Sequence, residues 1–509
     1  MNRRIQKECE STCEYILPDY MGDIRKVLMS RARVMPSGNF LSDGAVEANG
    51  SVEYEIIYAD SENKLTAINT DSDFEVKIPA DTDGCGGCEV ECELSSLSLR
   101  VVGPRKISLK STVRSEAILA ESGAPSVMGD VFEGDSKIEE EKKTIIAEIL
   151  KSALSEEREY AEEAERLPGV RGEDVEILTV SGSVRVTESE SVDGGVLVKG
   201  EIIIVALVRT PDQPAIAIRR VIPFEEKVTV DGADTGMNSF AEGFVTSAIC
   251  GVNEDEEGCA LVLNAIAKYR AGVFANEETE LVTDAYLCER ETENKYSLFE
   301  YKELVGCRHF DLSLNFSVPK ETVGCMDAAE ILIMNAEPRS VRATLGDNGV
   351  VLKGEMLISG VACENNVDGT KTYIPIKLQQ EFEQNVNIDC HIDDKCELEC
   401  RIFSPYCDAL LDAESVHVKV GLCGRILSER PRACERLSEC TSLGEAECAA
   451  SPSRITVYYP TAEDSLFKIA KKFHTTVAKL ASDNAIDESV MMKGEGDALD
   501  FVGSRIIIR

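Results

Sequence analysis

Tryptophan is absent from the 509-residue chain, and aromatic residues make up only 6% of it. The cores of its domains must therefore be built mainly from Val, Ile, Leu and Ala. Basic residues are also scarce, with 54 Lys and Arg against 92 Asp and Glu, which gives a formal net charge of −38. Nucleic acids and anionic membrane surfaces select for Lys and Arg patches, so this charge argues against both as partners. It favours high solubility, a basic protein partner or repulsion between copies.

Long apolar runs are also missing. No window approaches the ~18 consecutive apolar residues of a membrane-spanning helix, so no span is predicted. The N-terminal sequence MNRRIQKECESTCEYILPDYMG lacks the apolar core of a secretory signal, and we expect the chain to stay in the compartment where it is made.

Nineteen cysteines are present, an odd number, and many stand singly in apolar runs, as Cys259 and Cys423 do. This pattern favours reduced thiols in the cytosol, with late oxidation into crosslinks left open.

Catalytic motifs are absent as well. The sequence contains no HExxH, GxSxG or GxxxxGK[ST], and carboxylate pairs are too common in so acidic a chain for one to stand out. Its four histidines are His309, His391, His417 and His474. We therefore expect no enzymatic activity and no cofactor.

One cysteine group is a candidate metal site. Cys85-Gly-Gly-Cys88 is followed by Cys92, but a structural zinc needs four ligands, usually from two paired knuckles, and no second CxxC exists. Cys9 and Cys13 could complete the set only if folding brought them near. A turn with free thiols is the favoured interpretation, and a metal-dependent enzyme around Cys85 remains a distant alternative.

Internal repetition is the strongest signal in the chain. The segments GDIRKVL, GEDVEIL and MDAAEIL end on Leu28, Leu178 and Leu332, and each Leu is followed 22 residues later by a Gly that opens an apolar strand. These glycines are Gly50, Gly200 and Gly354. A Phe then begins FEVKI at Phe74, FEEKV at Phe224 and FEQNV at Phe382, the third after a four-residue insertion. Leu17-Pro18 and Leu167-Pro168 also repeat, so the chain contains three copies of one module.

Each copy has the pattern of a β-protein. Val52, Tyr54, Ile56 and Tyr58 alternate with mostly polar residues, which is typical of a strand with one face in a core. We predict a multidomain, mainly β chain: three repeated antiparallel β-sandwich modules and a small α+β (βααβ) domain.

The expected boundaries follow from these anchors. They are an N-terminal segment (1–22), module 1 (23–120), an acidic helical connection (121–170), module 2 (171–290), a connection (291–324), module 3 (325–430), a small-residue linker (431–453) and a terminal domain (454–509). In the first connection, Ile145, Ile149 and Leu154 have helical spacing, which predicts an amphipathic helix packed on a module or, alternatively, on a partner.

The terminal domain reads as strand, helix, helix, strand. ITVYY is the first strand, and Asp464 or Ser465 can cap a helix that begins at Leu466. The predicted core consists of Leu466, Ile469, Phe473 and Leu480. Residues 454–509 contain eight Lys and Arg and eight Asp and Glu, so the entire net charge lies on the first 453 residues. A neutral domain on an acidic body favours a distinct docking surface.

The motif D-S-L-F-x-I-A-x-x-F followed by T-V-x-x-L-x-x-x-N resembles the LysM domain. The sequence departs from glycan-binding LysM domains at Glu463, where those usually have Gly, and in the loop KGEGDALDFVGS, where they have Pro-Gly-Gln. The three β modules before it resemble the SPOCS modules of clostridial spore coat morphogenetic proteins.

This resemblance implies a non-enzymatic scaffold in spore coat assembly. Its LysM tail would dock onto the coat basement-layer ATPase and other coat proteins, in the mother-cell cytoplasm at the forespore surface. The alternative is a peptidoglycan- or cortex-binding protein that recognises N-acetylglucosamine-containing glycans. The expected docking face comprises Asp464, Ser465, Phe467, Lys468, Asn484, Ile486 and Lys493.

Overall fold

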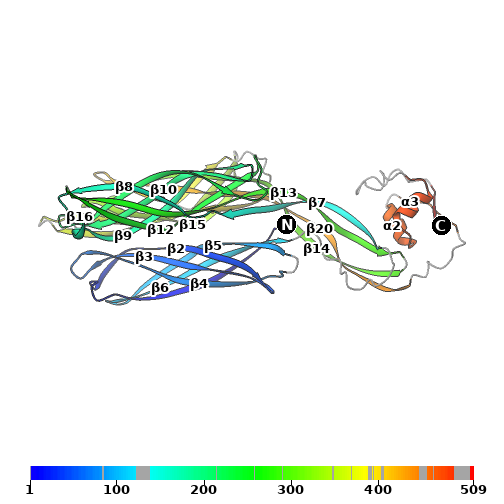
Figure 1. The fold of residues 1–509 in the computed structure, drawn as a ribbon, viewed down its shortest axis with the longest axis horizontal. Coiled ribbons are helices and arrows are strands. Elements are labelled where there is room, and N and C mark those ends of the chain that lie inside the picture. Colours follow the sequence, from blue (N-terminus) through cyan, green and yellow to red (C-terminus); the bar gives the residue numbers. More distant parts are fainter. Residues whose placement is uncertain are drawn as a thin grey trace.

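The computed structural model is mainly antiparallel β-structure, with two short helices near the C-terminus (Figure 1). No helix in the part of the chain that it describes is long and apolar enough to cross a bilayer. The described residues are 2–82, 85–121, 138–213, 215–256, 258–288, 290–346, 349–367, 370–387, 393, 395–402, 406–445, 455–461, 464–486 and 505–508. The expected mainly β architecture of repeated sandwiches and a terminal α+β unit is confirmed.

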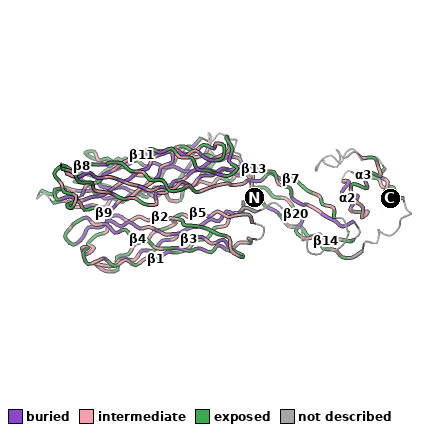
Figure 2. Tube along the Cα trace, in the orientation of Figure 1, coloured by how far each residue is buried: buried purple, intermediate pink, exposed green. Residues whose placement is uncertain are grey.

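Module 1 is a sandwich of two three-stranded sheets, with the orders β2-β3-β4 and β1-β6-β5. Val52, Tyr54 and Ile56 point from β3 into the core between the sheets, as their alternation predicts. Figure 2 shows how buried and exposed positions alternate along the strands. The bounds are β1 (Asn2–Ile16), β2 (Ile24–Ser42), β3 (Ala45–Asp60), β4 (Leu65–Pro79), β5 (Cys85–Gly103) and β6 (Lys106–Glu121).

Module 2 repeats this topology. Its first sheet has the order β9-β10-β11, and in its second sheet β13 lies between β12 and the pair β7 and β8. The N-terminal strand of module 1 is thus divided in two here, because β8 and β7 pair with successive parts of β13. The bounds are β7 (Ile138–Leu154), β8 (Arg158–Pro168), η1 (Gly172–Asp174), β9 (Glu176–Val192), β10 (Gly195–Arg209), β11 (Ile216–Thr229), β12 (Asn238–Asp255) and β13 (Gly258–Leu287).

Module 3 has the sheets β15-β16-β17 and β14-β20-β18, with β19 also paired to β20. Here the penultimate strand is the divided one. The bounds are β14 (Arg290–Pro319), α1 (Lys320–Val323), β15 (Ala328–Gly346), β16 (Gly349–Asn365), β17 (Lys371–Val386), β18 (Glu397–Ile402), β19 (Tyr406–Leu411) and β20 (Ser415–Glu445).

The repeated Gly and Phe face each other across neighbouring strands. Gly50 pairs with Phe74, and the same pairing occurs in the other two modules. A Cβ on Gly50 would lie 2.4 Å from the carbonyl oxygen of Met35 and 2.8 Å from the Phe74 ring. The glycine is required because the aromatic ring and the next strand occupy the space of a side chain.

The first sheets of the three modules meet in one shared apolar cluster, which we call the apolar layer. It is built from equivalent positions of the three copies, including the Leu that ends each repeated motif. Its members include Leu28, Leu178 and Leu332 from the motif and Ile57, Leu207 and Val361 from the central strands. Strands β3, β10 and β16 are therefore covered on both faces near this layer, once by their own module and once by its neighbours.

The longest strands leave the sandwiches together and form an arm (Figure 1). In the arm β7 pairs with β13 as far as Leu287, and β14 pairs with β20 from Arg290 to Glu445. The two ribbons pack face to face through Ile145, Leu281 and Phe299. At the far end lies the terminal unit, residues 455–508, with β21 (Thr456–Tyr458), α2 (Leu466–Lys472), α3 (Val477–Asp483) and β22 (Ile506–Ile508).

The helical prediction for 121–170 is wrong for the residues of this range that the structure describes. Residues 138–168 form β7 and β8, and Ile145 and Ala147 are buried while Ile146 between them is exposed. The run TIIAEIL fits the apolar spacing of a helix and also that of a strand. Strand β13, which is distant in the sequence, supplies the hydrogen bonds that favour the strand. Other segments set aside as connections also belong to sheets: residues 2–16 form β1, residues 290–319 form β14, and β20 continues through 431–445.

Candidate functional site

The terminal unit begins with a tightly bonded loop. Asp464 accepts hydrogen bonds from the backbone N–H of Thr461 at 2.7 Å and from the hydroxyl of Tyr458 at 3.1 Å. The bond from the Thr461 N–H is the main cause of a lowered pKa for Asp464. Ser465 caps α2 by accepting from the Lys468 N–H at 3.1 Å. Two residues of the predicted docking face therefore shape the loop between β21 and α2.

Asn484 joins α3 to the last strand. Its side-chain amide donates to the carbonyl oxygen of Ile507 at 2.7 Å and accepts from the Ile507 N–H at 2.6 Å. The same amide also donates to the carbonyl oxygen of Leu480. This side chain therefore bridges α3 and β22, and the nearby Ile486 packs on the core.

The core of the unit lies between the helices and the sheet. Leu466, Ile469 and Leu480 are buried together with Ile506 and Ile508. Phe473 packs edge-on against Tyr458, with ring centroids 5.6 Å apart. Lys468 lies exposed on α2, and Lys493 is outside the described residues.

The arm of the same chain covers Phe467. It is buried against Tyr286 of β13, ring centroid to ring centroid 5.2 Å. The Tyr286 hydroxyl donates to the carbonyl oxygen of Thr475 at 2.6 Å, and the Lys471 ammonium lies 2.6 Å from Asp284. Burial is the main cause of a raised pKa for Tyr286. The predicted docking face is thus divided, because part of α2 is already bound to the arm.

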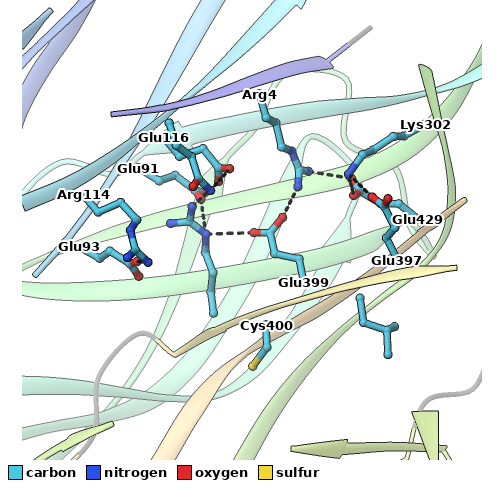
Figure 3. A pocket seen from close by; sticks show the side chains of 13 residues that line it. Arg4, Glu91, Glu93, Arg114, Glu116, Lys302, Glu397, Glu399, Cys400 and Glu429 are labelled. Atoms are coloured by element: carbon cyan, nitrogen blue, oxygen red, sulfur yellow. Dashed lines mark hydrogen bonds and ion pairs between the residues drawn. The ribbon is translucent and has the colours of Figure 1, made fainter. Parts of the chain in front are cut away.

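The second sheets of the modules meet at a buried cluster of charges, which we call the ionic junction (Figure 3). Glu91 of module 1 is its central carboxylate, only 2% exposed. Guanidinium groups of Arg270 from module 2 and of Arg401 and Arg425 from module 3 lie 3.0, 2.6 and 3.1 Å from it. Burial alone would raise the pKa of Glu91, but these three cations hold it well below its usual value.

Arg4 makes the reciprocal contact. This cation of module 1 lies 3.3 Å from Glu148 of module 2 and 2.9 Å from Glu429 of module 3, and it also pairs with Glu399. Module 1 is therefore tied to each of the other two modules by ion pairs with little access to water. A cavity of about 380 Å³ opens beside the junction, lined mainly by charged side chains.

The junction also contains a carboxylate group with the spacing of metal ligands, formed by Glu91, Glu116 and Glu399. Arg401 lies among them, 2.6, 2.5 and 3.1 Å from the respective carboxylates. Its guanidinium supplies the positive charge that a metal would bring. The arrangement is suited to holding modules together.

The three cysteines considered as a candidate metal site in the sequence lie along β5. The Cys88 thiol lies 3.5 Å from the Asn39 side-chain oxygen, and the Cys92 thiol lies 3.4 Å from the Ser115 hydroxyl. Cys85 lies near the carbonyl oxygen of Asp81. Within the described ranges, no cysteines converge into a group of three or more metal ligands.

Sequence reasoning missed the ionic junction and the arm contact. One signal was present: Arg425 stands in the apolar run GLCGRIL. A charge in such a position needs a buried partner. No comparable signal marks Tyr286, which looks like an ordinary strand residue.

Comparison with protein families identifies two parts of the chain. Residues 175–253 match the model described as "SipL, SPOCS domain", and residues 461–490 match the LysM domain. No curated protein and no solved structure matches the chain. The first match covers β9, β10, β11 and most of β12, the central part of module 2, and modules 1 and 3 repeat its strand order. The chain therefore combines a SipL-type SPOCS domain with a C-terminal LysM domain, as its sequence motifs predict.

Proposed function

We propose that this chain is a non-enzymatic adaptor in spore coat assembly. Its LysM domain docks onto the coat basement-layer ATPase at the forespore surface, while the three-module body occupies the mother-cell cytoplasm and contacts other coat proteins. The pairing of a SPOCS domain with a LysM domain in one chain is the observation that carries this proposal.

The position of the LysM domain supports an adaptor role. It lies at the end of the arm, well away from the sandwiches (Figure 1). The arm separates a neutral domain from an acidic body, so a partner can reach the LysM domain without contacting the sandwiches. Several weak contacts by linked domains then reinforce each other through effective concentration.

Binding of the full chain to the purified ATPase tests the proposal. We expect saturable binding in biolayer interferometry and localisation of a fluorescent fusion around the forespore in sporulating cells. Absence of both would refute the adaptor function.

Glycan binding is the second candidate, because the LysM match suggests recognition of peptidoglycan. Co-sedimentation of the full chain with purified peptidoglycan tests it. Sedimentation without any binding to the ATPase would favour the glycan function. Asn484 is a poor probe for this distinction, because its amide bridges α3 and β22 and its loss would weaken the fold itself.

A further inference from the structure

The two-stranded sheet of the LysM domain has one covered face and one open face. Tyr458, Ile506 and Ile508 point toward the helices and pack in the core. Alternate positions in β21 and directly beside it point the other way: Ile455 is 68% exposed, Val457 47% and Tyr459 68%. Three large apolar side chains at alternate positions of this short segment form one surface.

The neighbouring strand extends this surface. Ile507 pairs with Val457 and therefore lies on the same side of the sheet. Arg505 alternates with the inward-pointing Ile506, so it also belongs to the open face, and it is exposed. We call these five residues the outer sheet face: Ile455, Val457, Tyr459, Arg505 and Ile507.

The arm contacts a different side of the domain. It holds Phe467 and Lys471 of α2, and His474 after that helix lies 3.2 Å from Glu291 of β14. The outer sheet face therefore stays available while the domain is seated on the arm. Apolar side chains grouped in this way mark interaction surfaces.

We propose, on the basis of the adaptor function above, that the outer sheet face is the docking surface for the protein partner. The partner chemistry that fits it is an apolar patch bordered by carboxylates. Val457 and Tyr459 supply the apolar centre, since aromatic side chains surrounded by aliphatic ones carry much of the energy of such contacts. Arg505 supplies a positive edge on a chain whose net charge is −38. A carboxylate-bearing partner is repelled by the acidic body and attracted to this edge.

A protein fits this face better than a sugar. Sugar recognition needs several polar groups around the ring, and the outer sheet face offers one tyrosine hydroxyl and one guanidinium among aliphatic side chains. The polar side chains nearest the loops, Asp464 and Asn484, are already engaged in bonds within the domain.

Binding of full-length variants to the purified coat basement-layer ATPase tests the inference. We expect Val457→Asp and Tyr459→Ala each to weaken the dissociation constant by about tenfold or more, since each 1.4 kcal/mol of lost contact energy is a factor of ten. Arg505→Glu should slow association, most strongly at low salt. The matched control is Lys479→Asp, an exposed change of charge on α3 that should leave binding within about twofold. Circular dichroism melting should be unchanged in all four variants, because none of the side chains is buried.

The outcomes separate this inference from the proposed function. Wild-type binding that survives all the substitutions would overturn the outer sheet face and leave the adaptor function standing. Failure of the wild-type chain to bind would overturn both. Retention of the wild-type chain on peptidoglycan, lost in Val457→Asp, would assign the face to a glycan and refute the protein partner.

Discussion

Glu91→Gln should loosen module 1 from the other two modules. The substitution keeps the shape of the side chain and removes the carboxylate charge that contacts Arg270, Arg401 and Arg425 together. Breaking a buried ion pair by removing one partner costs about 3–5 kcal/mol. The three arginines keep other carboxylates within reach, among them Glu242 and Glu399. We therefore expect the lower end, about 3 kcal/mol, as a loss in the free energy of unfolding.

Urea unfolding followed by circular dichroism at pH 7 measures this loss. The matched control is Glu93→Gln on the same strand, where the carboxylate pairs with Arg114 at the surface and contributes at most about 1 kcal/mol. A loss in Glu91→Gln no larger than that of Glu93→Gln would refute the view that the ionic junction holds the modules together.

The same residue fixes the sign of a pH effect. Because the folded-state pKa of Glu91 is lowered, its contribution is fully present above the ordinary carboxyl pKa and is lost as pH falls below it. Titration of Glu91 should therefore leave the stability of the wild-type protein unchanged between about pH 6 and 8. In acid, the stability should fall steeply. The Glu91→Gln variant should show a shallower acid dependence.

Three further predictions concern other parts of the molecule. Leu28→Ala in the apolar layer should cost about 2–5 kcal/mol in urea unfolding, because Leu28 is fully buried; a loss under 1 kcal/mol, the scale of a surface change, would contradict tight packing there. Tyr286→Ala should free the LysM domain from the arm and speed hydrogen exchange in α2, whereas Tyr301→Ala, nearer the sandwiches, should not; equal exchange in both would refute the contact. Burial raises the pKa of Cys307 and Cys400 to about 12, so both should resist iodoacetamide at about pH 8 until the protein is denatured, as mass spectrometry can show. Alkylation of the native protein at these partly buried sites, as fast as in the denatured protein, would contradict the raised pKa.

The repeat made most of the fold predictable. The Gly50 and Phe74 positions recur in all three copies, with a four-residue insertion between them in the third, because they face each other across two strands; a contact in space thus left a trace in the sequence. The LysM domain was predictable for a similar reason, since its caps and core lie within a few turns of one another. These are local constraints, and each module repeats them.

The errors arose where distant segments meet. Ile145 and its neighbours fit a helix as well as a strand, and only pairing with β13 decides between them. Phe467 was predicted to lie on the docking face, yet Tyr286 from the arm covers it. Nothing in either local sequence encodes the other segment. Ile57 was expected on the polar face of its strand, and it is buried because a neighbouring module covers that face.

The two layers between the modules differ in what they specify. The apolar layer uses similar residues from each copy, so any three copies could form it. The ionic junction does not have this property. Its equivalent cross-strand pairs are Glu91 with Glu116 in module 1, Glu242 with Arg270 in module 2 and Arg401 with Arg425 in module 3.

Module 1 thus brings two acids, module 2 one acid and one base, and module 3 two bases. Three copies of module 1 would bury six carboxylates, and three copies of module 3 would bury six guanidiniums; both arrangements are strongly unfavourable. Three copies of module 2 would bury three of each. One copy of each gives three charges of either sign. Joining the copies in one chain allowed their charges to diverge, and the divergence in turn makes each module depend on the other two. The order of the modules around their common contact is therefore set by charge, and the arm that carries the LysM domain leaves the body at a defined place.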